Sequence, residues 1–273
     1  MTQEPVYLTT EGSIAQLILN RPAKRNALTR AMWAAIAEQA AAAAADPAVK
    51  VLVLRGAMPA AFAAGADIAE FAEVFASPET AHAYHEIVHA AYDAIAEVAK
   101  PTIAMVQGVC FGGGCALALC CDLRYADESA TFCIPPARLG LAYSLAETRR
   151  LVELVGPATA KEMLMGARVI EADEALRIGL ATRVFPAADL ERETMAFAKR
   201  LGELSQFTIR ATKAVIRDIL DGAVAETETS RSLFEEQFRS ADYVEGRQAF
   251  LEKREPHFTW RQTEAQKKRS GNC

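Results

Sequence analysis

The chain has 273 residues, with 30 Lys and Arg against 35 Asp and Glu, so its formal net charge at pH 7 is −5. Hydrophobic residues make up 51% and charged residues 24%, a balance typical of a globular protein and unlike that of a long disordered chain. Because nucleic-acid-binding proteins usually cluster positive charge to neutralise phosphates, the net negative charge predicts no nucleic-acid partner.

The N-terminal part of the sequence predicts a hairpin followed by a helix. Residues 6–9 and 14–19 have the composition of two strands joined by a glycine-containing turn. Thr29 can cap the helix that follows, which runs through a series of alanines to Ala45. Alanine is the best helix former, so this low-complexity run is interpreted as regular helix.

Strands then alternate with helices through the middle of the chain. Residues 49–56 form a continuous β-branched stretch, typical of a strand buried on both faces. A long helix is predicted over residues 78–99, a strand over 102–107, and two short strands over 123–126 and 130–133. This alternation indicates an α/β core, and the last third of the chain is predicted to be mostly helical.

Two loops rich in small residues each follow a predicted strand. They are AAFAAGAD at residues 60–67 and the segment 108–114, which ends in three glycines. Gly and Ala let a backbone N–H approach a ligand closely, and glycines ahead of a helix leave N–H groups unpaired. Two such amides aimed at one carbonyl oxygen form an oxyanion hole, which stabilises the enolate of a thioester. A tight turn without ligand is the alternative, and neither GxGxxG nor GxxxxGK occurs.

Targeting signals and cysteines set further expectations. No segment reaches the roughly 18 uncharged apolar residues of a membrane helix, and the first residues do not resemble a signal peptide. We therefore expect a cytoplasmic protein that makes no membrane contact. Five cysteines lie among small apolar residues, where thiols act as core side chains and not as metal ligands, namely Cys110, Cys115, Cys120, Cys121 and Cys133.

Seven segments stand in the order found in one known family. They are NRPAKRNAL at 20–28, AAFAAGADI at 60–68, KPTIAMVQGVCFGGG at 100–114, CDLRYADESATF at 121–132, LGLA at 139–142, GLATRVFP at 179–186 and EGRQAFLEKREPHF at 245–258. With these segments the chain resembles the crotonase superfamily, also called the enoyl-CoA hydratase/isomerase family, over essentially its whole length.

The resemblance implies an α/β fold with a crotonase-like ββα superhelix. The core that binds acyl-CoA would span residues 1–200, and residues 201–273 would form a helical C-terminal region that trimerises. It further implies an acyl-CoA lyase or isomerase, active as a homotrimer or hexamer. The substrate would be an acyl-CoA thioester, with coenzyme A as part of the substrate, no separate cofactor and no metal.

The resemblance also assigns site residues, position by position. The oxyanion hole would be the backbone N–H groups of Ala66 and Gly113. Lys24 and Arg25 suit the phosphates of CoA on physical grounds too, although a solvated charge pair is the alternative. The substrate contacts implied are Lys24, Arg25, Ala27, Ala64 and Ile68, with Phe250 and Lys253 reaching the CoA of a neighbouring subunit.

The sequence departs from the family where its hydratases carry two catalytic glutamates. The corresponding positions hold Ala116 and Pro136, and neither residue can transfer a proton. Where the dehalogenase branch has a nucleophilic aspartate, this chain has Ser144. A positioned acid or base is typically worth about 10²–10⁴-fold in rate. Loss of both glutamates should therefore cripple hydration by the usual mechanism.

Tyr143 and Glu147 are the candidates to replace the missing groups. The stretch PPARLGLAYSLAE partly resembles methylmalonyl-CoA decarboxylases, which carry a tyrosine where Tyr143 stands. Those enzymes also carry a glutamate at the position of Ala116 and a histidine at that of Ala66. Decarboxylation needs no base, because loss of CO₂ itself leaves the enolate. Glu147 can act as an acid or base in an apolar pocket. The alternatives are a packing role for Tyr143 and a helix-dipole role for Glu147.

The segment HEIVH at residues 85–89 matches the HExxH zinc-peptidase motif. It falls inside the long helix predicted before KPTIAMVQG, and a peptidase needs a third ligand, so we favour no metal here. We expect His89 to line the acyl pocket instead, as a histidine of the dehalogenase branch does. A non-catalytic acyl-CoA-binding protein is the alternative from another class.

Overall fold

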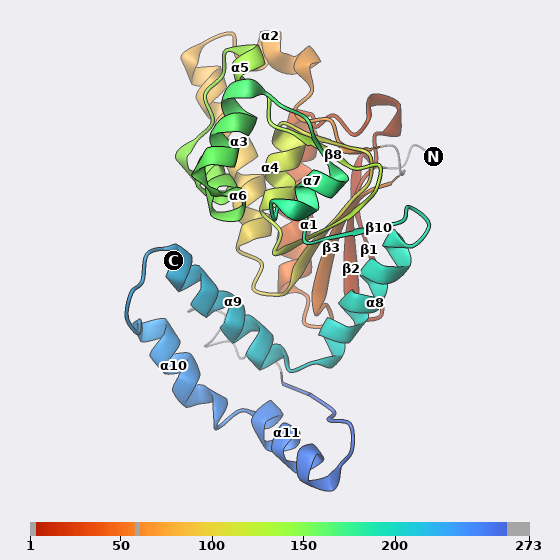
Figure 1. Cartoon of the computed structure of the whole chain (residues 1–273), viewed down its shortest axis with the longest axis vertical. Coiled ribbons are helices and arrows are strands. Elements are labelled where there is room, and N and C mark those ends of the chain that lie inside the picture. Colours follow the sequence, from red (N-terminus) through yellow and green to blue (C-terminus); the bar gives the residue numbers. More distant parts are fainter. Residues whose placement is uncertain (1–3, 58–60, 261–273) are drawn as a thin grey trace.

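The computed structural model describes residues 4–57 and 61–260, and its centre is a six-stranded sheet (Figure 1). The strand order is β1-β2-β3-β5-β7-β10, and every neighbouring pair is parallel except the hairpin β1–β2. The hairpin confirms the first prediction from sequence. The strands are β1 (Val6–Glu11), β2 (Ile14–Leu19), β3 (Val51–Gly56), β5 (Thr102–Val106), β7 (Leu123–Asp127) and β10 (Arg183–Phe185).

A second, four-stranded sheet has the order β4-β6-β8-β9. Its strands are β4 (Ala61–Ala63), β6 (Val109–Phe111), β8 (Thr131–Cys133) and β9 (Ile170–Glu171). β3, β5 and β7 of the large sheet are each followed along the chain by a short strand of this sheet and then by a helix. The repeated unit confirms the expected ββα superhelix. Of these short strands, only β8 was predicted from sequence.

Helices cover both faces of the large sheet. The helices of the core are α1 (Arg30–Ala45), α2 (Phe71–Val74), α3 (Pro78–Ala96), α4 (Gly113–Leu119), α5 (Pro136–Leu139), α6 (Leu145–Gly166), α7 (Ala172–Arg177) and α8 (Leu190–Glu203). α1 and α3 pack against each other, while α8 packs on β3, β5 and β7. Thr29 caps α1 by accepting a hydrogen bond from the N–H of Met32, as predicted.

β3 shows how the core is divided into two layers. Val51 and Val53 pack with the cluster beneath α8, whereas Leu52 and Leu54 belong to the larger cluster on the other face. Successive side chains of a strand point to opposite faces, so a strand that is covered on both sides must be apolar throughout. The expectation of a strand buried on both faces is confirmed.

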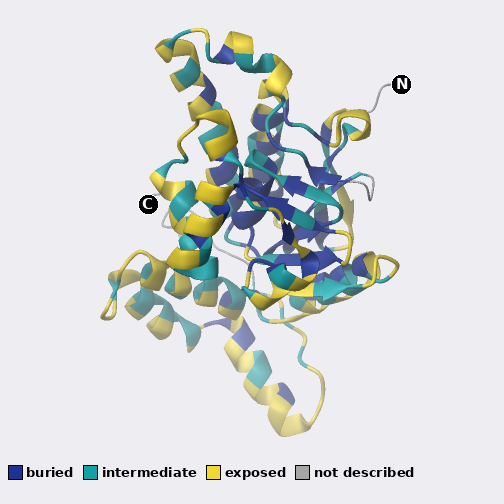
Figure 2. Cartoon of the chain, turned by 45° about the horizontal axis from the view of Figure 1, so that its top comes forward, coloured by how far each residue is buried: buried dark blue, intermediate teal, exposed yellow. Residues whose placement is uncertain are grey.

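Three helices follow the core and extend away from it (Figure 1). They are α9 (Gln206–Leu220), α10 (Glu228–Gln237) and α11 (Ala241–Glu252). This region is coloured mostly as exposed or half-buried in Figure 2. Large apolar residues are exposed on and between these helices, among them Ile216, Ile219, Val224, Phe234, Phe238, Phe250 and Leu251. No helix in the described ranges is long and apolar enough to cross a membrane.

Candidate active site

The two loops rich in small residues meet at one place. Ala66 forms an isolated bridge with Leu28, whose N–H donates to the carbonyl oxygen of Gly65 at 2.8 Å. The N–H of Asp67 in turn donates to the carbonyl oxygen of Leu28 at 2.9 Å. These bonds hold the chain on both sides of Ala66. Across from it, Gly113 is the first residue of α4.

Glycines allow the two loops to approach closely. A Cβ added to Gly65 would lie 3.0 Å from the carbonyl oxygen of Phe111 and 3.5 Å from the nitrogen of Gly113. Gly65 also has a φ of +99°, which a side chain rarely adopts. Within the described residues, neither the N–H of Ala66 nor that of Gly113 donates a hydrogen bond to another protein group. Two neighbouring unpaired amides are the donor arrangement that an oxyanion requires.

Two buried aromatic side chains lie against Gly113. A Cβ at position 113 would lie 3.1 Å from Cζ2 of Trp33 and 3.2 Å from the hydroxyl oxygen of Tyr92. The Tyr92 hydroxyl donates to the carbonyl oxygen of Gly113 at 3.3 Å, and the rings of Trp33 and Tyr92 pack edge to face at 5.4 Å. The indole N–H of Trp33 donates to the Tyr84 hydroxyl at 3.2 Å. Sequence reasoning missed these residues, because nothing but spacing along a helix marks a buried aromatic.

Tyr143 and Glu147 lie near Tyr92. Burial raises the pKa of the half-buried Tyr143 well above 10, and the neighbouring carboxylate of Glu147 adds to this effect. Burial likewise raises the pKa of Tyr92, with smaller contributions from Tyr143 and Glu147. Both phenols therefore stay protonated at neutral pH and can act as hydrogen-bond donors.

Glu147 also takes part in a capping box at the start of α6. Its N–H donates to Oγ of Ser144 at 3.2 Å, and the N–H of Ser144 donates to its Oε2 at 3.1 Å. The helix-terminal role considered from sequence is therefore present, and it also occupies Ser144 as the N-cap. The carboxylate of Glu147 thus caps the first turn of α6 and also lies near the Tyr143 phenol.

The positions expected to carry glutamates are filled by apolar residues. Ala116 is buried in α4, and Pro136 is buried at the first position of α5. A proline is well tolerated there, because the first N–H of a helix has no partner within it. Neither position offers an ionisable group.

The loop that carries Lys24 and Arg25 is joined to the loop of Ala66. The N–H of Ala64 donates to the carbonyl oxygen of Arg25 at 2.9 Å. The buried amide of Asn26 donates to the carbonyl oxygens of Ala61 and Phe62 at 2.9 and 3.1 Å, and its Oδ1 accepts from the N–H of Arg21 at 2.8 Å. Lys24 and Arg25 are exposed beside this junction.

The remaining predicted contacts of this loop lie close by. Ala27 is half-buried, and its carbonyl oxygen accepts from the guanidinium of Arg21 at 3.0 Å. Arg21 also pairs with Asp67, and this hydrogen bond lowers the pKa of the Asp67 carboxyl. Ile68 follows in a 3₁₀ turn and is 63% exposed. The structure therefore brings Lys24, Arg25, Ala27, Ala64, Ala66 and Ile68 together. Asn26 and Arg21, which hold them, were missed from sequence.

His89 lies on the face of α3 that carries Tyr92. The two rings are 6.2 Å apart, and the ring of His89 is 6.5 Å from that of His85. His89 is half-buried, at the edge of the aromatic group beside Gly113. Among the described residues, no group of three or more His, Cys, Asp or Glu side chains is arranged to hold a metal ion.

Phe250 and Lys253 are not brought to these loops within one chain. Both belong to the end of α11, which lies far from α4 (Figure 1). Phe250 is 83% exposed, and Lys253 is exposed at the left-handed C-cap of the helix. A contact between these residues and a CoA would have to involve another copy of the chain.

Comparison with known proteins gives the family to which this fold belongs. The family model for enoyl-CoA hydratase/isomerase matches residues 9–261. A crotonyl-CoA hydratase from Syntrophomonas wolfei is 37% identical over 264 residues, which cover 94% of this chain and 99% of that protein. A 2,3-dehydroadipyl-CoA hydratase from Escherichia coli is 36% identical over 258 residues, with 94% and 99% covered.

Solved structures agree with the sequence relatives. The crystal structure of an enoyl-CoA hydratase/isomerase family protein from Hyphomonas neptunium superposes with a TM-score of 0.92 at 41% identity, covering 94% of this chain and 98% of that one. An enoyl-CoA hydratase/carnitine racemase from Magnetospirillum magneticum superposes with a TM-score of 0.90 at 36% identity, with 94% and 96% covered. The chain belongs to the enoyl-CoA hydratase/isomerase family.

Proposed function

We propose that the protein is an enzyme that acts on an acyl-CoA thioester and stabilises its enolate with the N–H groups of Ala66 and Gly113. The observation that carries this proposal is the pair of unpartnered amides, held close by Gly65 and Gly112. When a bond at the α-carbon breaks, negative charge develops on the thioester oxygen. Donors fixed in advance stabilise that charge without reorganisation, which typically contributes a factor of about 10²–10³ per donor.

The CoA part of the substrate would be held by the loop next to these amides. Lys24 and Arg25 are exposed where the phosphates can reach them, and Ala27, Ala64 and Ile68 lie at the same junction. Phe250 and Lys253 would contact the CoA of a neighbouring subunit in a homotrimer or hexamer. The exposed apolar side chains of α9–α11 support this assembly, because such surfaces usually mark contacts between chains.

The reaction proposed is not hydration by two glutamates. Several relatives are named hydratases, but Ala116 and Pro136 leave this chain without ionisable groups at the two positions where the family's hydratases carry glutamates. Any acid–base step must use other groups. Tyr143 and Glu147, which lie near Tyr92, are the candidates, and His89 would line the acyl pocket at the edge of the aromatic group.

Decarboxylation of a malonyl-type thioester is the second candidate, favoured by the burial of Tyr143. In that reaction the bond between the α-carbon and the carboxylate breaks, CO₂ leaves, and the electron pair remains as the enolate. A proton must then reach the α-carbon. A half-buried phenol that stays protonated can orient the carboxylate by hydrogen bonding before CO₂ leaves. It can then donate this proton and recover it from solvent.

One panel of substrates tests both candidates. The full chain is supplied with crotonyl-CoA and with malonyl-CoA or methylmalonyl-CoA, while double-bond absorbance and CO₂ release are followed. Release of CO₂ without loss of double-bond absorbance supports the decarboxylase. Rapid hydration that survives Tyr143→Phe and Glu147→Gln would contradict the view that ordinary hydration is lost. Tight binding of CoA esters without turnover would instead indicate the non-catalytic acyl-CoA-binding alternative.

A cytoplasmic location is part of the same proposal. The five cysteines in the described part of the chain are free, buried thiols, as is usual for proteins of a reducing compartment.

A further inference from the structure

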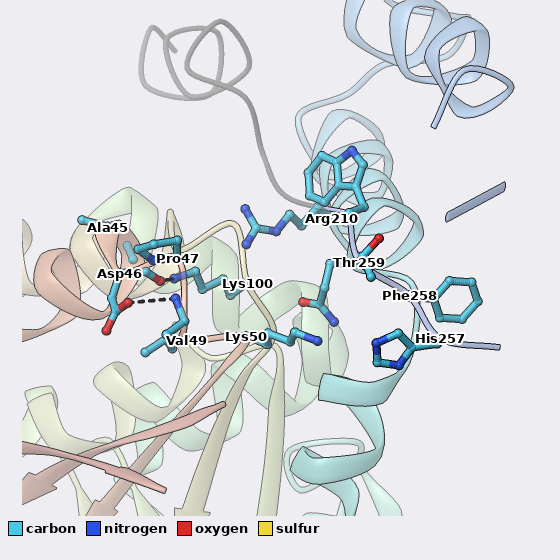
Figure 3. A pocket seen from close by; sticks show the side chains of 14 residues that line it. Ala45, Asp46, Pro47, Val49, Lys50, Lys100, Arg210, His257, Phe258 and Thr259 are labelled. Atoms are coloured by element: carbon cyan, nitrogen blue, oxygen red, sulfur yellow. Dashed lines mark hydrogen bonds between the residues drawn. The ribbon is translucent and has the colours of Figure 1, made fainter. Parts of the chain in front are cut away.

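A cavity of about 380 Å³ lies at the end of α1 that is remote from Gly113 (Figure 3). Trp33, which contacts Gly113, belongs to the first turn of α1, whereas Ala45 and Asp46 at its last turn line the cavity. Because a helix rises about 1.5 Å per residue, about 18 Å of helix separates the two places. The cavity is therefore distinct from the candidate active site.

Positive side chains outnumber negative ones on the walls of this cavity. Lys50, Lys100 and Arg210 line it together with His257, and Asp46 is the one carboxylate among the described lining residues. Oδ1 of Asp46 accepts a hydrogen bond from the N–H of Ala48 at 2.8 Å, so this carboxylate helps to end α1. The cavity is thus locally cationic in a chain whose net charge is −5.

Two of the cations are fixed in position. The ammonium group of Lys50 donates to the carbonyl oxygen of Gly202 at 2.8 Å. That partner is neutral, so the charge of Lys50 stays available to a ligand. The guanidinium of Arg210 packs over the ring of Trp260 at 5.5 Å, and burial lowers the pKa of Arg210. A phosphate accepts strong, charge-assisted hydrogen bonds from a guanidinium.

A buried polar atom provides a second, independent indication of a ligand. Gln206 lines the cavity and is only 4% exposed. Its Nε2 donates to the carbonyl oxygens of Leu201 and Leu204 at 2.9 and 3.1 Å, which fixes the orientation of the amide. Its Oε1 is buried and has no hydrogen-bond partner in the described structure. Leaving a buried acceptor unpaired is unfavourable, so the site suits a ligand that also offers a donor.

The N-terminal end of α9 adds partial positive charge near the cavity. Gln206 is the first residue of this 15-residue helix, so the helix begins beside the cavity; the N–H of Thr208 in its first turn is already capped by Oγ of Ser205 at 3.2 Å. The N-terminal end of a helix carries a partial positive charge that favours phosphate.

We propose that this cavity binds a phosphate monoester that carries hydroxyl groups, of the size of a sugar phosphate. The phosphate would be held by Arg210 and Lys50 near the start of α9, and a ligand hydroxyl would donate to Oε1 of Gln206. A phosphate offers three acceptor oxygens and a charge of about −1.5 to −2, which suits several cations better than a single carboxylate does.

Isothermal titration calorimetry of the full chain with ribose 5-phosphate tests the proposal, with inorganic phosphate and ribose as comparison ligands. Saturable binding of one ribose 5-phosphate per chain is expected, with weaker binding of inorganic phosphate and none of ribose over the same range. Arg210→Gln and Lys50→Gln should each weaken the affinity about 10-fold or more, because a charged hydrogen bond is worth about 1.5–3 kcal/mol. Lys199→Gln, which removes an exposed cation of α8, should leave the affinity unchanged.

Several results would overturn the proposal. One is the absence of saturable binding of ribose 5-phosphate in the millimolar range. Another is equal affinity for inorganic phosphate, which would indicate an adventitious ion only. If Lys199→Gln weakened binding as much as the cavity variants do, the affinity would reflect general charge attraction. If CoA displaced ribose 5-phosphate equally from Arg210→Gln and from wild type, ribose 5-phosphate would be bound at the candidate active site and not in this cavity. Thermal melting shows whether each variant is folded. If Arg210→Gln does not fold, Lys50→Gln alone still tests the proposal.

Discussion

The Tyr92 hydroxyl donates a hydrogen bond to the carbonyl oxygen of Gly113 across 3.3 Å, from a side chain that is almost fully buried. Tyr92 therefore acts on the residue that carries one of the two candidate oxyanion amides, without being exposed to substrate itself. Together with Trp33, it packs against the first residue of α4. This contact makes Tyr92 a positioning residue for the proposed chemistry.

Tyr92→Phe should lower kcat by about 2- to 10-fold with little change in KM. The variant keeps the ring but loses one hydrogen bond, and such a bond contributes about 0.5–1.5 kcal/mol. Steady-state kinetics on the best substrate of the panel measures the effect. Tyr125→Phe is the matched control, because Tyr125 is buried in the other layer of the core, beneath α8. Equal kcat values for Tyr92→Phe and wild type would show that the hydroxyl does not position Gly113.

The amide of Gly113 can be tested by comparing two substitutions at the same position. Gly113→Ala adds a Cβ against Trp33 and Tyr92 but keeps the N–H, whereas Gly113→Pro adds similar crowding and removes the N–H. Proline is tolerated at the first position of a helix, so α4 should still form. We expect Gly113→Pro to be about 10²–10³-fold slower than Gly113→Ala. Similar rates in the two variants would exclude this amide from the oxyanion hole.

Lys24 and Arg25 should affect binding only of substrates that carry phosphates. The double variant Lys24→Gln/Arg25→Gln is expected to raise KM for the acyl-CoA about 2- to 10-fold, because each exposed ion pair contributes about 0.2–1 kcal/mol. The matching acyl-pantetheine, which has no phosphates, serves as the control substrate, and its kcat/KM should not change. Equal losses with both substrates would indicate that the loop itself is disturbed.

Glu147 has two separable roles, and two substitutions distinguish them. Glu147→Gln keeps an oxygen that can accept from the N–H of Ser144, so the stability of the fold should stay within about 0.5 kcal/mol of wild type. Glu147→Ala removes the acceptor and should cost about 0.5–2 kcal/mol. Urea unfolding measures both. If Glu147 transfers a proton, the two variants should lose activity equally despite their different stabilities. Full activity in Glu147→Gln would show that Glu147 transfers no proton and serves only to cap α6.

The stability of the fold should fall as the pH rises above about 9, because buried thiols resist ionisation. Burial raises the pKa of Cys120 from 9.0 to about 12, and it raises those of Cys110 and Cys121 as well. Between about pH 9 and 12 the unfolded chain releases the proton of Cys120 while the folded chain keeps it, so unfolding becomes more favourable. Each such group contributes about 1.4 kcal/mol per pH unit.

Urea unfolding at a series of pH values, for wild type and Cys120→Ala, measures this contribution. The variant should lose stability less steeply with pH by about the amount of one thiol, while Glu128→Gln, at an exposed position, should follow wild type. Identical slopes for Cys120→Ala and wild type would show that this thiol ionises equally easily in both states.

Much of the fold could be predicted from local patterns. The continuous apolar run of β3 and the capping residue of α1 depend on neighbours in the chain, and both were correctly placed. The strands β4, β6 and β9 were not predicted, because segments of two or three residues carry no usable periodicity. Those strands exist through pairing with partners remote in sequence, such as Ala61 with Val109.

The candidate site was predicted only in part for a similar reason. Glycines and alanines in a loop after a strand mark the place where a backbone can approach a ligand, so Ala66 and Gly113 could be found. Tyr92 and Trp33 look like ordinary core residues in the sequence, and their contact with Gly113 arises only when α1 and α3 pack together. Asn26, with a φ of +54°, gave no signal beyond its place in a matching segment.

The buried amide of Asn26 has a consequence for substrate length. Two of its hydrogen bonds fasten the loop of Lys24 and Arg25 to the strand that leads to Ala66, and the third, from the N–H of Arg21, closes the loop itself. In the proposed enzyme, the phosphates of CoA and the thioester oxygen are then gripped at a fixed separation. In such an enzyme, the length of the pantetheine arm would have to match that separation.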